Sequence, residues 1–281
     1  MRYVCALFAE LAYHHLPRME LDPKRMRAKL VPSYAYQALV KRGRATDVTA
    51  YLPGAIDSQD AFAVTTDRAV AVGVRLGNEW FIGFRGTKLL YGADWFVNGK
   101  FRLVAAGSSP ARSGPGRFHS GFAHEAARIS AKVIDAVKAS SLPNPAQVFL
   151  TGHSLGGAVA AISHDHLRFG PTAVCLFGAP RYGDRNAYAN AVDPCPTQIR
   201  RRGDEVPTVP PKWLGYADPP LALAPDGTMF VDPSFLGKVV ALPKFFAHFF
   251  HQHSMESYRH DLGRVAGATE WRKPLTDFDR L

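Results

Sequence analysis

The most reactive arrangement in the sequence is a serine between two glycines, Gly152-His153-Ser154-Leu155-Gly156, a G-x-S-x-G pattern. A serine on the sharp turn between a strand and a helix has a strained backbone, so the positions two residues before and after it need small side chains. The turn projects the Ser154 hydroxyl above the sheet and leaves the Leu155 amide at the positive end of the next helix, where it can stabilise an oxyanion. The pattern predicts a nucleophile for acyl transfer; the alternative is a glycine-rich turn with a fortuitous serine.

Four ordered blocks of the sequence resemble the class 3 lipases, the fungal-type triacylglycerol lipase family with an α/β-hydrolase-like fold. The G-x-S-x-G sequence is similar to the family's pentapeptide. Residues 84–87 resemble its oxyanion segment, residues 118–122 its H-x-G-F block, and residues 177–183 its G-x-P-x-x-G block. The resemblance extends from about residue 60 to 260, and it implies a serine hydrolase.

The same resemblance implies an acid. Residues 203–207 are similar to the family's D-x-V-P segment, which indicates Asp204 as the carboxylate that orients the base. Glu205 is the alternative for the orienting acid. The other alternative is that Asp204 is a solvent-exposed residue without a catalytic role. Arg200-Arg201-Arg202 stand where the family has apolar strand residues, a departure that concerns the local register of the strand.

The base is implied in the same way. Residues 253–258 are similar to the family's closing H-x-x-x-x-Y pattern, which indicates His253. A metal site with H-x-x-H-x-H spacing is disfavoured, because His251 and His253 would point to different sides of one helix and no aspartate or cysteine completes a set. His153 is expected to pack beside the turn and to point away from the serine. Three further histidines are alternatives for the base: His248, His251 and His260.

The remaining candidate residues follow the strand expected at residues 80–84. The resemblance implies that the amide of Thr87 faces that of Leu155 across the oxyanion. Residues 88–98 take the place of the family's lid, with capping of the core as the alternative. An aromatic stripe within residues 245–250 is more typical of core packing than of an acyl pocket. The apolar side chains that we predict to bind substrate are Leu89, Leu90, Trp95 and Phe96.

Hydrophobic periodicity predicts the elements that position these residues. A meander of three strands precedes strands that alternate with helices, which predicts an α/β fold: an α/β-hydrolase-like, mostly parallel central sheet with helices on both faces. No linker divides the chain, so residues 1–281 are expected to form one domain, with an N-terminal helix and basic segment (residues 1–58) packed on it. Strands are expected at residues 61–65, 69–76, 80–84, 147–150, 172–177 and 197–201, and helices at residues 3–15, 121–139 and 155–168.

Composition excludes several classes. With 47% hydrophobic and 21% charged residues, the chain is neither disordered nor fibrous. The three cysteines lack the spacing of a structural zinc site. A serine hydrolase requires no cofactor and no metal, so we expect neither. No secretory signal or membrane span is recognisable, so the expected location is cytoplasmic by default, or outside the cell by a route that the sequence does not reveal.

The formal net charge is +10, and eight basic side chains against two acids lie within residues 17–46. This segment is a candidate for contact with an anionic membrane surface, with a solvated basic face as the alternative. Its basic runs contain no aromatic residues and the segment matches no nucleic-acid module, so no nucleic-acid partner is expected.

These observations predict a hydrolase of lipid carboxylic esters, a triacylglycerol lipase or carboxylesterase, that works through a Ser-His-Asp triad and an acyl-enzyme intermediate. A phospholipase A1 or short-chain esterase with the same triad is the alternative among enzymes. A non-catalytic lipase-like module, acting through protein or membrane contacts, is the alternative from another class.

Overall fold

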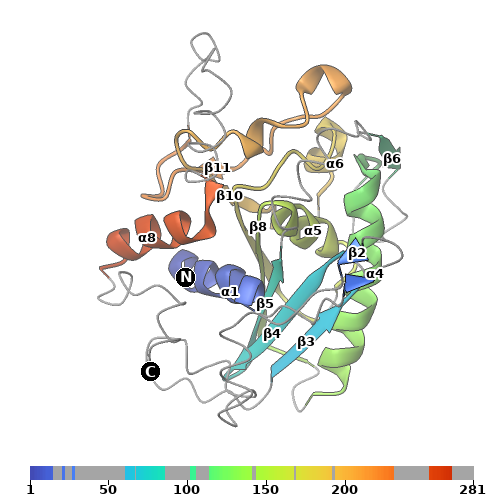
Figure 1. Cartoon of the computed structure of the whole chain (residues 1–281), viewed down its shortest axis with the longest axis vertical. Helices are drawn as coiled ribbons and strands as arrows, with labels where there is room; N and C mark the ends of the chain where they lie inside the picture. The colour runs from blue at the N-terminus through green and yellow to red at the C-terminus, as the bar shows by residue number, and fades with distance from the viewer. Residues whose placement is uncertain are drawn as a thin grey trace.

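A seven-stranded sheet forms the centre of the protein, in the order β11-β10-β9-β8-β5-β4-β3 (Figure 1). The five neighbouring strands β11, β10, β9, β8 and β5 are parallel to one another. Strand β4 runs antiparallel to both of its neighbours, β5 and β3. The computed structural model describes residues 1–14, 21–22, 27–28, 61–66, 68–85, 102–105, 114–140, 144–167, 169–191, 194–230 and 253–267. The strands of the sheet are β3 (Ala61–Thr65), β4 (Val70–Leu76), β5 (Glu79–Arg85), β8 (Gln147–His153), β9 (Thr172–Phe177), β10 (Thr197–Ile199) and β11 (Ala222–Leu223).

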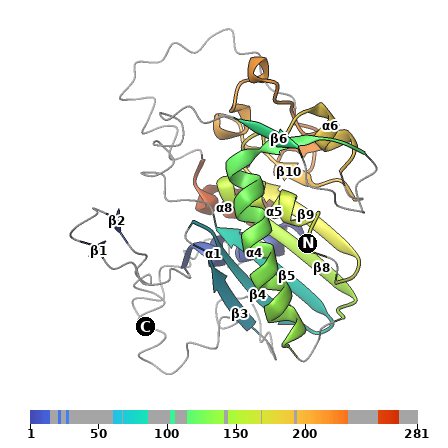
Figure 2. The same cartoon turned by 90° about the vertical axis from the view of Figure 1, so that its right-hand side faces the viewer.

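Helices cover both faces of this sheet (Figure 2). On one face α4 (Ser120–Lys138) and α5 (Leu155–Ser163) share a buried apolar cluster with the strands, and on the other α1 (Arg2–His14) and α8 (Met255–Val265) share a second cluster. The predicted α/β fold, with a mostly parallel sheet between two helical layers, is therefore confirmed. The smaller elements are β1 (Leu21–Asp22) paired with β2 (Arg27–Ala28), β6 (Leu103–Ala105) paired with β7 (Arg117–His119), α6 (Arg185–Ala189), and the 3₁₀ turns η2 (Val206–Thr208) and η3 (Lys212–Leu214).

The amphipathic pattern of α4 explains its position. Its apolar residues recur every three or four positions, and the buried face packs on the sheet. The helix begins where Nδ1 of His119 accepts a hydrogen bond from the Gly121 amide, 3.2 Å away. The H-x-G-F block thus caps a helix. The buried apolar residues of that face are Phe122, Ala126, Ile129, Val133 and Val137.

The N-terminal helix α1 is buried more completely than an amphipathic surface helix. Phe8 is fully buried, and its ring stacks on Phe81 of β5 with 4.8 Å between the ring centroids. Phe81 in turn stacks on Phe149 of β8 at 4.6 Å. Helix α1 therefore forms part of the core directly beneath the strand that leads to Ser154. No helix in the described ranges is long and apolar enough to cross a membrane.

Three predicted boundaries are wrong. The strand expected at residues 147–150 continues to His153, directly before the turn at Ser154. The helix expected at residues 155–168 ends at Ser163, because the amides of Asp165 and His166 bond three residues back, and Leu167 then lies in the core. The strand expected at residues 197–201 ends at Ile199, because the chain turns around Gly203, whose φ is +82°. The three consecutive arginines therefore follow the strand instead of lying within it.

Candidate active site

Ser154 lies on a sharp turn between β8 and α5. Its φ of 59° is positive, and no other described residue except glycine has such a value. A Cβ atom at Gly152 would lie 2.4 Å from the carbonyl oxygen of Gly156, so only glycine fits where the helix folds back on the strand. The Ser154 amide donates to the Phe177 carbonyl at the end of β9, 2.9 Å away. The strained turn is thus held by its neighbour strand.

The histidine that meets this serine is His253. Its Nε2 atom lies 2.8 Å from Oγ of Ser154, and its Nδ1 atom lies 3.0 Å from both carboxylate oxygens of Asp204. All three side chains are buried: the exposed fractions are 6%, 0% and 6% for Ser154, His253 and Asp204. Three sequence-predicted residues that are far apart along the chain therefore come together in one hydrogen-bonded chain. Asp204 contacts the imidazole, whereas Glu205 precedes η2 and His260 lies within α8.

The carboxylate of Asp204 is held by two further donors. Its Oδ1 accepts from the Val206 amide at 3.0 Å, and its Oδ2 accepts from the Tyr258 hydroxyl at 2.6 Å. Burial, together with the charge of Asp204 and this hydrogen bond, raises the pKa of Tyr258 well above its usual value, so the phenol keeps its proton. Both oxygens are thereby occupied as acceptors, which fixes the plane of the carboxylate.

Gly178, in the G-x-P-x-x-G block, leaves the space in which the carboxylate lies. Its φ is +54°, and a Cβ there would lie 2.6 Å from Oδ2 of Asp204 and 2.9 Å from the Tyr258 hydroxyl. Any larger residue would displace the acid. The block therefore shapes the floor of the site.

His153 takes a more specific position than the packing role expected for it. Its Nε2 lies 2.5 Å from the backbone carbonyl of His253, and the two imidazole rings are 4.5 Å apart. Its Nδ1 lies 2.8 Å from the Tyr13 hydroxyl on α1. Burial, followed by the charge of His253, lowers the pKa of His153 well below its usual value, so the ring is neutral. A neutral ring that donates from Nε2 must accept at Nδ1, which makes Tyr13 the donor.

Sequence reasoning did not assign the roles of Tyr13, His153, Gly178 and Tyr258. Tyr258 ends the H-x-x-x-x-Y pattern, and this spacing puts it one turn into α8, where its hydroxyl reaches Asp204. Tyr13 had no signal other than its place on an amphipathic helix.

The expected oxyanion donors are only partly described. Leu155 is the first residue of α5, where a helix leaves its amides without acceptors inside the helix. Several predicted residues lie outside the described part of the chain: Thr87, Leu89, Leu90, Trp95, Phe96, the histidines His248 and His251, and the aromatic stripe of residues 245–250. Within the ranges that the structure describes, no three His, Cys, Asp or Glu side chains gather as a metal site would require.

The known proteins to which this chain is similar are lipases. Residues 81–213 match the family described as lipase (class 3). The chain is 36% identical over 104 residues to the secreted mono- and diacylglycerol lipase 1 of Fusarium solani, covering 35% of this chain and 31% of that protein. It is 40% identical over 86 residues to lipase A of Sodiomyces alcalophilus, covering 24% of this chain and 21% of that protein. The chain thus spans less than a third of either curated relative.

Among solved structures, the chain is similar to mono- and diacylglycerol lipase from Aspergillus oryzae. The TM-score is 0.58 at 17% identity, over 90% of this chain and 97% of that chain. At this level of identity the similarity concerns the fold, an α/β-hydrolase fold.

Proposed function

We propose that this protein is a serine hydrolase that cleaves carboxylic esters of acylglycerol lipids, a proposal supported by the match of residues 81–213 to the family described as lipase (class 3). The observation that carries the proposal is the continuous contact from Ser154 Oγ to His253 Nε2 at 2.8 Å and from His253 Nδ1 to Asp204 at 3.0 Å. The order serine, acid, histidine along the chain is that of an α/β-hydrolase triad.

In the first half-reaction His253 takes the proton of Ser154 as its oxygen attacks the ester carbonyl. Asp204 holds Nδ1 of the imidazole as the donor and stabilises the imidazolium that forms. The imidazolium then gives its proton to the alcohol that leaves, and an acyl-enzyme remains on Ser154.

In the second half-reaction water attacks the acyl-enzyme, and the same imidazole accepts its proton. The acid is released, and Ser154 regains its hydrogen. The proposed oxyanion donors are the amide of Leu155, at the N-terminus of α5, and the amide of Thr87, two residues after β5 ends. Leu89, Leu90, Trp95 and Phe96 are proposed to contact the acyl chain.

Labelling with a fluorophosphonate tests the nucleophile. The wild-type chain should be labelled at Ser154, and the Ser154→Ala variant should not. Folded wild-type protein that never reacts would overturn the proposal in favour of a non-catalytic lipase-like module.

Hydrolysis rates on emulsified monoacyl-, diacyl- and triacylglycerols test the substrate class. The name of the Fusarium solani relative specifies mono- and diacylglycerols. Phospholipids and short-chain esters belong in the same panel, because faster cleavage of either would favour the phospholipase A1 or short-chain esterase alternative. Contact of residues 17–46 with an anionic membrane surface remains a prediction, since most of that segment lies outside the described residues.

A further inference from the structure

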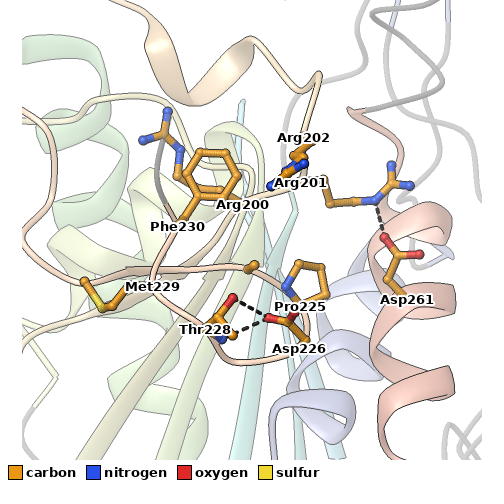
Figure 3. A pocket seen from close by; sticks show the side chains of 10 residues that line it. Arg200, Arg201, Arg202, Pro225, Asp226, Thr228, Met229, Phe230 and Asp261 are labelled. Atoms are coloured by element: carbon orange, nitrogen blue, oxygen red, sulfur yellow. Dashed lines mark hydrogen bonds and ion pairs between the residues drawn. The ribbon is translucent and has the colours of Figure 1, made fainter. Parts of the chain in front are cut away.

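A cavity lies beyond the ends of β10 and β11, and its wall contains the three consecutive arginines. Its volume is about 420 Å³, within the range of small-molecule sites. Figure 3 shows the residues that line it. Neither Ser154, Asp204 nor His253 is among them. In α/β sheets, ligands bind outside the carboxyl ends of parallel strands, and β10 and β11 pair in parallel. The lining residues are Arg200, Arg201, Arg202, Ala224, Pro225, Asp226, Thr228, Met229, Phe230 and Asp261.

The wall of the cavity is well ordered. The amide of Arg200 donates to the Leu223 carbonyl at 2.8 Å, and the amide of Phe230 donates to the Ala222 carbonyl at 2.9 Å. The guanidinium of Arg200 lies over the Phe230 ring, 5.0 Å from its centroid, as Figure 3 shows. A cation stacked on an aromatic ring is held in a fixed direction. Two backbone hydrogen bonds and one contact between a cation and an aromatic ring therefore hold this wall together.

Both carboxylates of the wall are already engaged. Oδ2 of Asp261 accepts from Nε of Arg201 at 2.6 Å. Oδ1 of Asp226 accepts from the Thr228 amide at 2.9 Å and from its hydroxyl at 2.7 Å (Figure 3). The acids thus face partners within the wall, which reduces the repulsion that an entering anion would meet.

The charges of the wall do not cancel. The lining contains three guanidinium groups and two carboxylates. A fourth guanidinium, that of Arg2 on α1, lies against the same turn: a Cβ at Gly227 would be 2.5 Å from its Nη1. These named groups leave an excess of two positive charges, and guanidinium groups bind phosphate oxygens in pairs.

We propose that this cavity binds a phosphate group carried by a small organic molecule, such as a phosphate monoester or the headgroup of an anionic phospholipid. A phosphate monoester carries close to two negative charges at neutral pH, which matches the excess, whereas a carboxylate carries one. The apolar part of the wall, Ala224, Pro225, Met229 and Phe230, accommodates the organic portion. Met229 is 61% exposed and lies where a bound molecule would extend toward solvent.

Two kinds of probe distinguish the possible sources of the phosphate. Calorimetric titration of the full chain with glycerol 3-phosphate, inorganic phosphate and butyrate measures binding of free anions. Co-sedimentation with ether-linked phosphatidylcholine vesicles, with and without ether-linked phosphatidic acid, measures binding of a headgroup. Ether-linked lipids have no carboxylic ester, so the result does not depend on the proposed hydrolase activity.

The test variant is Arg202→Gln, because Arg202 is exposed and its loss should not disturb folding. The matched control is Arg68→Gln, which removes the same charge from an exposed position beside β3, at the opposite edge of the sheet. We expect saturable binding of glycerol 3-phosphate, of phosphatidic acid vesicles, or of both, weakened about tenfold by Arg202→Gln and unchanged by Arg68→Gln. Binding of vesicles alone would identify the lipid headgroup as the source.

Three results would overturn the proposal. The first is the absence of saturable binding of any phosphate probe. The second is an equal loss in both variants, which would indicate diffuse attraction by the net charge of +10. The third is butyrate binding as tightly as glycerol 3-phosphate, which would mean that the cavity does not select phosphate.

Discussion

The backbone carbonyl of His253 accepts a hydrogen bond from Nε2 of His153, 2.5 Å away. This contact joins the residue before Ser154, the proposed nucleophile, to the main chain of His253, the proposed base. His153 is in turn fixed by the Tyr13 hydroxyl, 2.8 Å from its Nδ1. Helix α1 therefore helps to orient the imidazole of His253, through the contacts of Tyr13 with His153 and of His153 with His253.

From this contact we predict that His153→Ala lowers kcat by roughly tenfold to a hundredfold and leaves KM nearly unchanged. The reason is that small displacements of a base are costly, whereas His153 contacts the base and not the substrate. His153→Gln, whose amide can reach the same carbonyl, should restore part of the loss. His124→Ala, at an exposed position of α4, is the control. If His153→Ala lowered only the unfolding free energy, the residue would merely pack.

A second prediction compares two glycines with nearly equal backbone angles. Gly178 has a φ of +54° and Gly77 a φ of +57°, so alanine costs both positions about 1 kcal/mol of strain. Only at Gly178 would the new Cβ also meet Asp204, at 2.6 Å; at Gly77 nothing lies within 4 Å. Gly178→Ala should therefore lower kcat by about a hundredfold, and Gly77→Ala should change only the unfolding free energy. Steady-state kinetics and denaturant titration separate the two effects, and equal kinetics for both variants would show that the site absorbs the methyl group.

Sequence patterns predicted the features that depend on neighbouring residues. The turn around Ser154 is local, because Gly152 leaves the space in which the backbone of Gly156 lies. The apolar spacing of α4 likewise predicted the buried face of that helix. These features need only a few adjacent positions to be specified.

Contacts between distant segments could not be predicted in the same way. Tyr13 and His153 are 140 positions apart, and their hydrogen bond depends on how α1 packs on β5 and β8. The end of β10 at Ile199 depends on the turn at Gly203 and not on the apolar pattern before it. Such features arise from the packed sheet as a whole, which a single sequence does not display.

A third prediction concerns the phenol that holds the acid. Tyr258→Phe removes the hydroxyl 2.6 Å from Oδ2 of Asp204 and keeps the ring, so the unfolding free energy should fall by about 1–3 kcal/mol and kcat severalfold. Tyr188→Phe is a matched control. The buried hydroxyl of Tyr188, which lies on α6 and not on α8, accepts a hydrogen bond from the Tyr182 amide at 3.1 Å. The control should lose similar stability and retain kcat. An unchanged kcat in Tyr258→Phe would mean that the Val206 amide and His253 suffice to hold the carboxylate.

A buried ion pair joins α1 to α8 and gives the stability a predictable dependence on pH. Nε of Arg259, which is 1% exposed, donates to Oε2 of Glu10, which is 7% exposed. Burial raises the pKa of Glu10 from its usual 4.5 to about 7, and the charge of Arg259 only partly opposes this. Between these values the folded protein keeps a proton that the unfolded chain has lost. The stabilisation that the proton on Glu10 gives to the folded protein is therefore complete below pH 4.5, and it is lost as the pH rises through 7.

We predict that the unfolding free energy of the wild-type protein falls relative to that of Glu10→Gln as the pH rises from 4.5 to 7. The difference should approach, at most, about 3 kcal/mol, since each pH unit contributes up to about 1.36 kcal/mol for one proton. Glutamine keeps the size of the side chain and cannot ionise, so subtracting its curve removes the titration of every other group. Urea titrations of both proteins at successive pH values provide the measurement. A wild-type protein that instead gains stability over this range, relative to the variant, would mean that attraction to Arg259 outweighs burial and lowers the pKa of Glu10.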